Sequence, residues 1–155
     1  MLFYTTSAPD IEHADVNMAI VYATGLGLPD RDYYFREDPK SVELRTQYVE
    51  HICKVLQLAG APVTSADAAT VMRLETALAG PQLDLVARRD PSKVNHRIPL
   101  NDLKALTPGF DWAAYLKGIG APAFTTLNVT QPDYLKALDG LLSSTPLEDV
   151  RLYLR

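Results

Sequence analysis

Few residues in this chain have the types and spacing that chemistry at a protein site requires. Its three histidines, His13, His51 and His96, lie far apart in the sequence, and Cys53 is its single cysteine. A catalytic metal needs about three converging protein ligands, and a nucleophile needs a base within hydrogen-bond reach. The spacing provides neither arrangement, so we predict no catalytic residue and no metal ligand in this chain.

Two of these side chains fall on a predicted helix. His51 lies within the apolar stripe of this helix and allows two interpretations. The first is a metal ligand or a proton shuttle, and the second is a half-buried histidine that is hydrogen-bonded to a neighbour. We favour the second interpretation because no second type of metal ligand lies nearby. Cys53 is expected to pack rather than react, since Lys54 is the only cation that flanks it. His13 and His96 are expected to be solvated side chains in connections.

The carboxylate of most interest is that of Glu75. Residues 65–79 predict a helix whose apolar face also contains this acid. A buried acid needs a cation or several hydrogen-bond donors, and it can serve either catalysis or structure. We favour an internal ion pair, with Arg31 as the expected partner and Arg88 or Arg89 as alternatives, because buried acids are usually paired for structural reasons.

The stretch from Gly25 to Phe35 carries the densest backbone constraints in the chain. Its glycines allow backbone angles closed to other residues, its proline fixes φ, and its aspartates can accept hydrogen bonds from the next turn. Three aromatic residues follow, and the preceding arginine can lie over a ring or bridge the two carboxylates. The stretch has no nucleophile and no base poised near neutral pH. We therefore predict a buried structural elbow formed by Gly27, Pro29, Asp30, Arg31, Asp32, Tyr33 and Tyr34.

The sequence as a whole predicts a mainly α fold, a multi-helix lobe with a small β element near its N-terminus. Runs of β-branched and aromatic residues predict short strands near residues 2–6 and 16–22, with residues 7–10 breaking the chain between them. A long connection with one short helical turn is predicted over 81–99, and a strand over 125–129. Caps and apolar spacing predict helices over residues 39–59, 65–79, 100–106, 111–119, 132–142 and 146–154.

Two of these helices indicate that the chain belongs to something larger. The apolar arc of the helix over residues 39–59 is broad and predicts packing on more than one side. Residues 145–148 predict a capping box for the last helix, and no terminating glycine, asparagine or proline follows it before Arg155. We therefore expect residues 1–155 to form a single helical domain that is a fragment of a longer protein.

Composition excludes several classes of function. The chain has 155 residues, 47% of them apolar, which is enough for one domain with a real core. Its formal net charge of -4 and the absence of a basic run argue against a nucleic-acid partner or an anionic membrane surface. Residues 1–6 lack the basic start and long apolar run of a signal peptide. We expect an ordinary soluble protein without a membrane segment.

Several short motifs resemble those of one enzyme family. The run Gly27-Leu28-Pro29-Asp30-Arg31-Asp32-Tyr33-Tyr34 is similar to a signature in the non-catalytic part of the neprilysin-like zinc metallopeptidases. That family includes neprilysin, endothelin-converting enzyme and bacterial oligopeptidases. The resemblance continues along nearly the whole chain in shorter matches at Leu74-Glu75, Arg89-Asp90-Pro91, Asp111-Trp112 and Pro132-Asp133-Tyr134-Leu135.

The resemblance implies a role other than catalysis for this region. In that family an H-E-x-x-H helix and a downstream acid supply the zinc ligands and the general base, and no histidine here has that spacing. The matched region corresponds to the helical lobe that covers the zinc lobe and limits the peptides able to enter. We expect a non-catalytic lid of a zinc metalloendopeptidase, with no cofactor in this chain and zinc in the parent enzyme.

The same resemblance sets the expected partners. They are the remainder of the parent chain, with its zinc lobe, and the peptides that the parent hydrolyses, while the isolated piece is expected to self-associate through uncovered apolar faces. Animal members are cross-linked ectoenzymes, so a chain with one cysteine points to a bacterial parent, periplasmic or secreted rather than cytoplasmic. The alternative function is a stand-alone helical interaction module without enzymatic activity. An H-E-x-x-H motif beyond Arg155 would separate the two.

Overall fold

A four-stranded sheet joins strands from the beginning of the chain to strands near its end. Its order is β1-β2-β4-β3, with β1 (Phe3–Pro9) antiparallel to β2 (Asn17–Ala23). β4 (Thr126–Val129) runs parallel to β2. The short β3 (Arg97–Pro99) is antiparallel to β4 at the far edge. The sheet therefore forms only after most of the chain has been placed.

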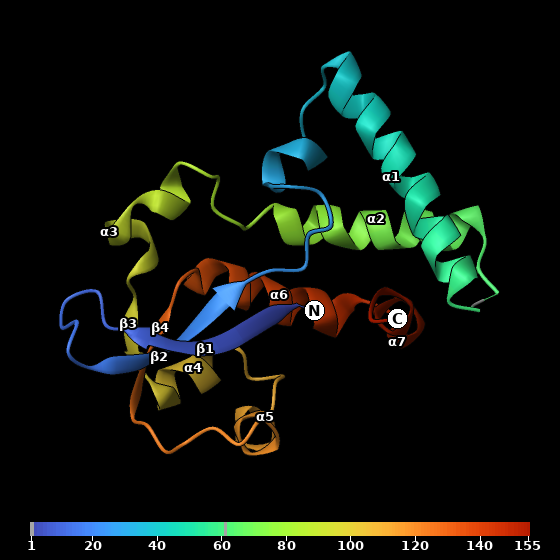
Figure 1. Cartoon of the computed structure of the whole chain (residues 1–155). Coiled ribbons are helices and arrows are strands. Elements are labelled where there is room, and N and C mark those ends of the chain that lie inside the picture. The colour runs from blue at the N-terminus through green and yellow to red at the C-terminus, as the bar shows by residue number, and fades with distance from the viewer. Residues whose placement is uncertain (1, 61) are drawn as a thin grey trace.

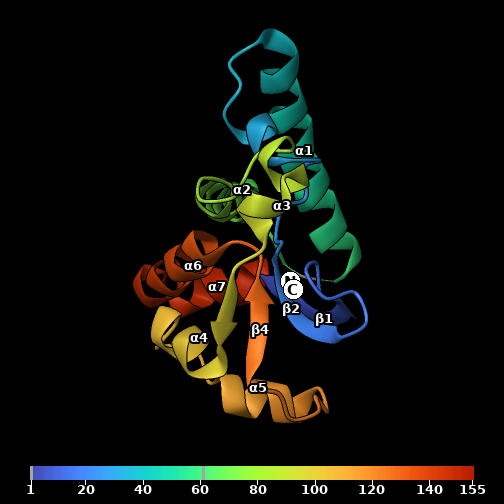
Figure 2. The ribbon, with the colours of Figure 1, turned by 90° about the vertical axis from the view of Figure 1, so that its left-hand side faces the viewer.

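Seven α-helices accompany this sheet in the part of the chain that our computed structural model describes, residues 2–60 and 62–155. With the two 3₁₀ helices, they are η1 (Arg31–Tyr34), α1 (Pro39–Leu58), α2 (Ser65–Ala79), η2 (Ala87–Arg89), α3 (Pro91–Val94), α4 (Leu100–Leu106), α5 (Trp112–Gly118), α6 (Pro132–Ser144) and α7 (Leu147–Tyr153). Helices α4, α5 and α6 lie near the sheet, whereas α1 and α2 form a separate corner (Figure 1, Figure 2). None of these helices is both long and apolar enough to span a membrane.

The main core lies between one face of the sheet and the helices. From the sheet it takes Val21, Leu127 and Val129, which point to the same face because side chains alternate along a strand. Helices α2, α4, α5 and α6 supply the other buried members, Leu78, Leu103, Trp112, Tyr134, Leu135 and Leu138. This core fixes the sheet end of the molecule, and smaller clusters hold the α1–α2 corner.

Local sequence explains where the two longest helices begin. At α1 the side chain of Asp38 accepts a hydrogen bond from the Ser41 N–H, and Pro39 stands in the first turn, where its missing N–H removes no helix bond. At α2, Thr64 and Asp67 form a reciprocal capping box. Both starts agree with their predictions, and the fold class, mainly α with a small β element near the N-terminus, is confirmed.

The strands extend further than the sequence predicts. β1 continues through Ser7 to Pro9, where the prediction has a break, because an edge strand accepts a proline whose missing N–H faces away from its neighbour. β3 has no counterpart in the prediction, since three residues give no readable alternation and they pair only because β4 lies beside them. Residues 81–99 do contain the expected helical turn, as η2 followed by α3.

The turn of the β1–β2 hairpin reaches across the sheet to the far edge. The carboxylate of Asp10 lies 3.2 Å from the guanidinium of Arg97 on β3. The side chain of Asn95 donates to Glu12 at 3.2 Å. These two contacts tie the hairpin to β3, which lies on the opposite edge of the sheet from β1.

The last helix begins differently from its prediction. The hydroxyl of Thr145 donates to the carbonyl oxygen of Leu141 at 2.6 Å, so it finishes α6 rather than capping α7. Helix α7 starts after Pro146 without any side-chain cap. The predicted capping box at residues 145–148 is therefore wrong, because the preceding helix uses the hydroxyl.

Helix α1 packs on one side only within the described residues. Ile52 and Leu56 are buried against α2. Elsewhere on the helix, Val42, Val55 and Leu58 are 45%, 46% and 79% exposed. The predicted packing on more than one side is thus not found among the described residues, and α1 leaves several apolar side chains in solvent.

Trp112 tests how far this core holds the fold together. It is the largest fully buried side chain, and its indole N–H donates to the hydroxyl of Thr107 at 2.7 Å. We expect Trp112→Ala to lower the free energy of unfolding by about 3–5 kcal/mol, because it opens a cavity and leaves that hydroxyl without its donor. Urea denaturation followed by circular dichroism measures the change.

Tyr4→Ala is the control, since Tyr4 is 40% exposed and stacks on Tyr22 at the surface of the sheet. It should lower the free energy of unfolding by less than about 1 kcal/mol. Equal losses in the two variants would contradict the position of the core. We also propose that residues 1–155 form one domain, so two separate unfolding transitions would count against that proposal.

Candidate functional site

The segment from Thr24 to Leu28 carries the chain from the sheet to the helical corner, and side chains from distant helices hold it. The hydroxyl of Tyr134 on α6 lies 2.8 Å from the Thr24 oxygen, and the hydroxyl of Tyr153 on α7 donates to the Gly25 oxygen at 2.6 Å. Gly25 has a φ of 96°, a left-handed conformation that glycine adopts without strain. The path of this segment therefore depends on helices near the end of the chain.

The carboxylate of Glu75 on α2 is held at this turn by three donors. The hydroxyl of Tyr34 donates to Glu75 Oε2 at 2.6 Å, and the hydroxyl of Tyr48 lies 2.9 and 3.0 Å from the two carboxylate oxygens. The Gly27 N–H also donates to Oε2, at 3.1 Å. Glu75 is only 5% exposed, which confirms the prediction that it is buried. We call Gly27, Tyr34, Tyr48 and Glu75 the Glu75 cluster.

The phenol of Tyr34 links this carboxylate to the backbone of the elbow. While it donates to Glu75, its oxygen accepts from the Leu28 N–H at 3.0 Å and from the Gly27 N–H at 3.1 Å. One side chain of η1 thus satisfies two backbone donors and one buried acceptor. The prediction that the elbow is a structural turn has its physical basis in this contact.

Burial and the nearby carboxylate keep the tyrosine hydroxyls at this site protonated. Burial first, and then the hydrogen bond to Glu75, raise the pKa of Tyr34 well above its ordinary value of 10.0. Burial and the Glu75 charge likewise raise the pKa of Tyr48 and of Tyr153 above 10.0. Each hydroxyl therefore remains a donor at neutral pH, and the cluster is a fixed hydrogen-bond network rather than a site of proton transfer.

Gly27 is required by a close approach and not by its backbone angles. A Cβ atom at this position would lie 1.8 Å from the hydroxyl oxygen and 2.6 Å from the Cζ atom of Tyr48. No side chain can occupy that space unless the aromatic ring moves. The sequence prediction, in which both glycines of the turn serve unusual φ values, therefore applies to Gly25 alone.

The structure does not bring Arg31 to Glu75. Its guanidinium donates to the backbone oxygens of Ala79 and Gly80 at the end of α2, both at 3.3 Å, and lies 5.6 Å from the ring centroid of Phe35. The alternative partners, Arg88 and Arg89, are exposed on η2. The expected ion pair is therefore not formed among the described residues, because two hydroxyls and an amide already satisfy the carboxylate.

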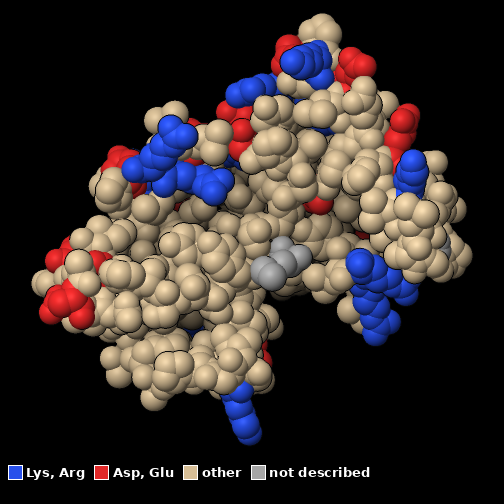
Figure 3. Space-filling model, in the orientation of Figure 1, with Lys and Arg blue, Asp and Glu red and all other residues tan. Residues whose placement is uncertain are grey.

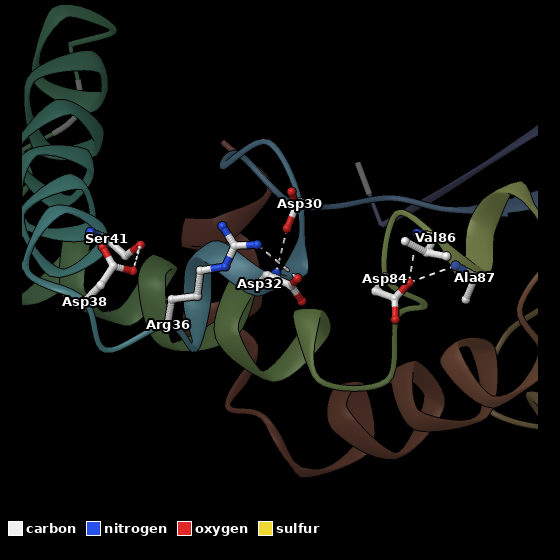
Figure 4. A network of polar contacts seen from close by, with 8 residues as sticks. All are labelled: Asp30, Asp32, Arg36, Asp38, Ser41, Asp84, Val86 and Ala87. Atoms are coloured by element: carbon white, nitrogen blue, oxygen red, sulfur yellow. Dashed lines mark hydrogen bonds and ion pairs between the residues drawn. The ribbon is translucent and has the colours of Figure 1, made fainter.

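The remaining elbow residues form local networks that set the angle between η1 and α1. Asp30 accepts from the Asp32 N–H at 2.8 Å, and Asp32 in turn pairs with Arg36 at 3.3 Å instead of with Arg31 (Figure 4). The guanidinium of Arg45 on α1 donates to the Tyr33 oxygen at 2.9 Å. Pro29 is exposed, whereas Leu28 before it and Tyr34 later in the elbow are buried. Asp84, also in Figure 4, binds two N–H groups at η2 in the same way.

Two residues of this site escaped the sequence analysis in their actual roles. Tyr48 fits the predicted apolar stripe of α1, and its spacing carries no sign that its hydroxyl binds an acid. In the sequence Arg45 looks like an ordinary surface cation, although its guanidinium donates hydrogen bonds to two backbone oxygens in and just after the elbow. A buried acid that needs donors was the only available signal, and it did not identify which donors.

The histidines and the cysteine do not form a site among the described residues. His51 is exposed on α1, so the prediction of a half-buried histidine is wrong. His13 is exposed as expected, whereas His96 is half-buried beside β3. Cys53 is a free thiol packed against the α1–α2 cluster. None of these positions brings an acid–base pair to a nucleophile.

A groove of about 340 Å³ runs between α1 and α7 next to the Glu75 cluster. Val55, which lines it on the α1 side, is 46% exposed. Arg155 and His51 border the groove. Its other lining residues are Gly27, Tyr48, Ile52, Leu56, Val71, Leu152 and Tyr153. The site as a whole can hold apolar groups against a rigid wall.

Comparison with known proteins identifies the family. A family model described as Peptidase family M13 matches residues 1–155, the whole of the chain. The chain belongs to peptidase family M13. Endothelin-converting enzyme 1 of Rattus norvegicus is 27% identical to this M13 chain over 145 residues, which cover 88% of the chain and 19% of the enzyme. Endothelin-converting enzyme-like 1 of Rattus norvegicus is 28% identical over 160 residues, covering 99% and 20%.

Solved structures share the fold of the M13 chain. The zinc metalloprotease Zmp1 of Mycobacterium tuberculosis, in complex with an inhibitor, superposes with a TM-score of 0.89 at 28% identity, covering 99% of this chain and 24% of Zmp1. PepO from Lactobacillus rhamnosis HN001, at 18% identity and a TM-score of 0.75, shares the fold alone. The M13 chain therefore spans about a fifth to a quarter of the relatives it matches. The resemblance to neprilysin-like metallopeptidases is confirmed.

The residues of the M13 chain that the structure describes do not fit a zinc ion. No three of their histidine, cysteine, aspartate and glutamate side chains come together as a metal-binding group. Structural and catalytic zinc sites need three or four such ligands. Glu75 is already bound by two hydroxyls and an amide, which would have to leave before a metal could approach.

The donors of the Glu75 cluster can be tested one hydroxyl at a time. We expect Tyr34→Phe in the M13 chain to lower the free energy of unfolding by about 2–3 kcal/mol, because it removes a bond to a charged group and leaves the Leu28 N–H without an acceptor. Tyr33→Phe is the matched control, since its hydroxyl has no hydrogen-bond partner among the described residues. It should change stability by less than about 0.5 kcal/mol, and equal losses in urea denaturation would refute the role of the cluster.

The raised tyrosine pKa values also predict a pH dependence. In the unfolded chain Tyr34, Tyr48 and Tyr153 titrate near 10.0, and in the folded chain they titrate higher. Their contribution to stability is therefore complete below about pH 10 and is lost as the pH rises towards the folded values. We expect the free energy of unfolding to fall between about pH 9 and pH 11, with a shallower slope in Tyr34→Phe, and a slope unchanged by this substitution would contradict the assignment.

Proposed function

We propose that this chain is a non-catalytic, substrate-enclosing part of a zinc metallopeptidase that hydrolyses peptides. The match of the whole chain to family M13 supports the class of enzyme, and the fold that it shares with 24% of Zmp1 supports a role as one part of a larger molecule. The zinc ligands and the general base are then supplied by the remainder of the parent chain. What this chain contributes is a wall of fixed shape.

The α1–α7 groove is the observation that carries this proposal. Val55 lines the groove and is 46% exposed. Leu58, one helical turn further along α1, and Leu154, between the lining residues Tyr153 and Arg155, are 79% and 56% exposed. A monomeric protein rarely leaves a row of such side chains in water, so a surface of this kind usually meets another part of the same assembly. In the parent, that cover is the zinc lobe, and the space between the two lobes is where a peptide is enclosed.

The Glu75 cluster gives the wall its rigidity. The elbow, α1 and α2 meet at one carboxylate, so these three elements move together and the edge of the enclosed space is set by their common position. A rigid rim admits short extended chains and rejects folded proteins by size. The chain therefore acts on specificity through geometry, and bond cleavage takes place on residues elsewhere.

The proposal predicts that opening the lobe contact relaxes size selection. In the full-length parent, we expect Val55→Glu with Leu58→Glu to raise the ratio of kcat/KM for a folded-protein substrate to that for a short peptide by about tenfold. Two charges placed in an apolar contact disfavour the closed arrangement by more than about 1.4 kcal/mol. The measurement is steady-state kinetics on a fluorogenic short peptide and on a small folded protein.

The matched control is Leu85→Glu with Val86→Glu, an exposed apolar pair beside η2, at 46% and 81%, that lies outside the groove. This control should leave the ratio unchanged. The same ratio in all three proteins would show that the groove does not gate access, and the alternative of a helical interaction module would replace the proposal. A full-length parent that cleaves no peptide would do so as well.

A further inference from the structure

β1 is the outer strand on one side of the sheet, and its hydrogen bonds show which backbone groups are free. The Asp10 N–H donates to the Val16 oxygen at 2.8 Å, one step beyond the Pro9–Asn17 pair of the ladder. In an antiparallel ladder, hydrogen-bonded residues alternate along the strand. Every second residue counted back from Asp10 therefore bonds to β2, beginning with Ala8 and Thr6.

The intervening residues of β1 point their N–H and C=O groups away from the sheet. These residues are Phe3, Thr5 and Ser7, and Pro9 follows at the next outward position. A proline fits there because an outward N–H has no ladder partner to lose. Within residues 2–60 and 62–155, no strand pairs with this edge.

The edge has little of the usual protection against pairing, because Pro9 blocks only its last outward position. Exposed edge strands normally carry charged side chains, above all lysine, that discourage another strand from adding. β1 has the sequence Phe-Tyr-Thr-Thr-Ser-Ala-Pro, without a single charge. An edge with open backbone groups and a neutral sequence is built to accept a further strand.

A groove of about 440 Å³ lies between this strand and α5, on the core face of the sheet. Its lining includes Thr5, Ser7, Ala19, Trp112, Leu116 and Ile119. Among the described residues that line it, none is aspartate, glutamate, lysine or arginine. Figure 3 shows charged side chains gathered mainly towards the rim of the molecule, with much of the visible surface uncharged. The groove suits an apolar side chain and offers no counter-ion to a charged one.

The edge and the groove lie in register with each other. A residue on an added strand directly opposite Thr5 or Ser7 projects its side chain to the same face as these two residues. That is the face on which both of them line the groove. Pairing at the edge would therefore deliver alternate side chains of the added strand into the groove.

We propose that the outer edge of β1 and this groove bind an extended, uncharged peptide as an added strand. The inference rests on the proposed function and names a substrate subsite. Main-chain hydrogen bonds recognise what all peptides share, and the groove adds a preference for apolar residues at alternate positions. A peptidase gains from such a subsite because it orients a long substrate before the scissile bond reaches the metal.

Hydrogen exchange on the full-length parent tests the subsite directly. The probe is the capped peptide acetyl-Ser-Leu-Ser-Leu-Ser-Leu-Ser-amide, kept cold and checked for integrity by mass spectrometry. We expect saturating peptide to slow exchange of the outward amides of Phe3, Thr5 and Ser7 by about tenfold or more, because these amides gain acceptors. The same peptide with N-methylated leucines, which cannot donate at those positions, should give no protection.

Three variants distinguish binding at this site from non-specific peptide binding. Ile119→Lys places a charge at the mouth of the groove, where Ile119 is 51% exposed, and should weaken peptide binding about tenfold. Ser7→Pro removes an outward N–H without breaking a bond to β2 and should weaken it to a similar extent. Val86→Lys, at a position 81% exposed and outside the groove, is the matched control and should bind as the unaltered protein does.

Three results would overturn the inference. They are protection of the outward amides of Phe3, Thr5 and Ser7 before any peptide is added, which would mean that another part of the parent covers the edge, an absence of peptide-dependent protection, and equal affinity in all variants. Hydrolysis is assayed separately. Edge binding in a parent that cleaves no peptide would refute the proposed function and keep the peptide site, whereas cleavage without edge protection would do the reverse.

Discussion

Glu75 loses its water when α2 packs, and at 5% exposure its charge has to be offset inside the protein. The offset comes from donors on three separate elements, the elbow backbone, η1 and α1, and not from a cation. Because each donor is useful only in one position, the carboxylate fixes these elements relative to α2. The shape of the helical corner, and of the groove beside it, follows from that single requirement.

The same requirement explains why the elbow sequence is so restricted. The ring of Tyr48 reaches the carboxylate only by passing where a Cβ of residue 27 would stand, so glycine is obligatory there. Tyr34 must be buried to serve both Glu75 and the Leu28 N–H, and the turn before it must be sharp enough to bring it back. The rigid arrangement of the elbow, α1 and α2 therefore follows from the hydrogen bonds that the buried carboxylate of Glu75 requires.

Much of the fold can be predicted from sequence because its signals are local. Caps such as Asp38 before α1 and Thr64 before α2 lie within three residues of the groups they bind, and the periodicity of α6 is read within one helix. β3 and the length of β1 cannot be predicted in this way, since both depend on pairing across the sheet. Thr145 was misplaced because its hydroxyl can serve either of two adjacent helices, and only packing decides.

The site was half predictable for a related reason. Helical spacing places Glu75 on an apolar face, and burial of an acid implies donors. Which donors they are depends on contacts between residues far apart in the sequence. The sequence alone does not show whether a tyrosine hydroxyl or an arginine will reach the acid. Arg31 is the cation that the sequence analysis pairs with Glu75. In the structure its guanidinium instead donates to the carbonyl oxygens at the end of α2, which also need partners.

The parallel pairing of β2 with β4 has a consequence for folding during synthesis on the ribosome. Ala19 lies opposite Leu127, so the β1–β2 hairpin leaves the exit tunnel long before its second neighbour exists. At about 5–20 residues per second, that interval is roughly 5–20 s. Throughout it, the inner side of β2 exposes apolar side chains that β4 covers only later, so the unpaired strand is prone to aggregation during this interval.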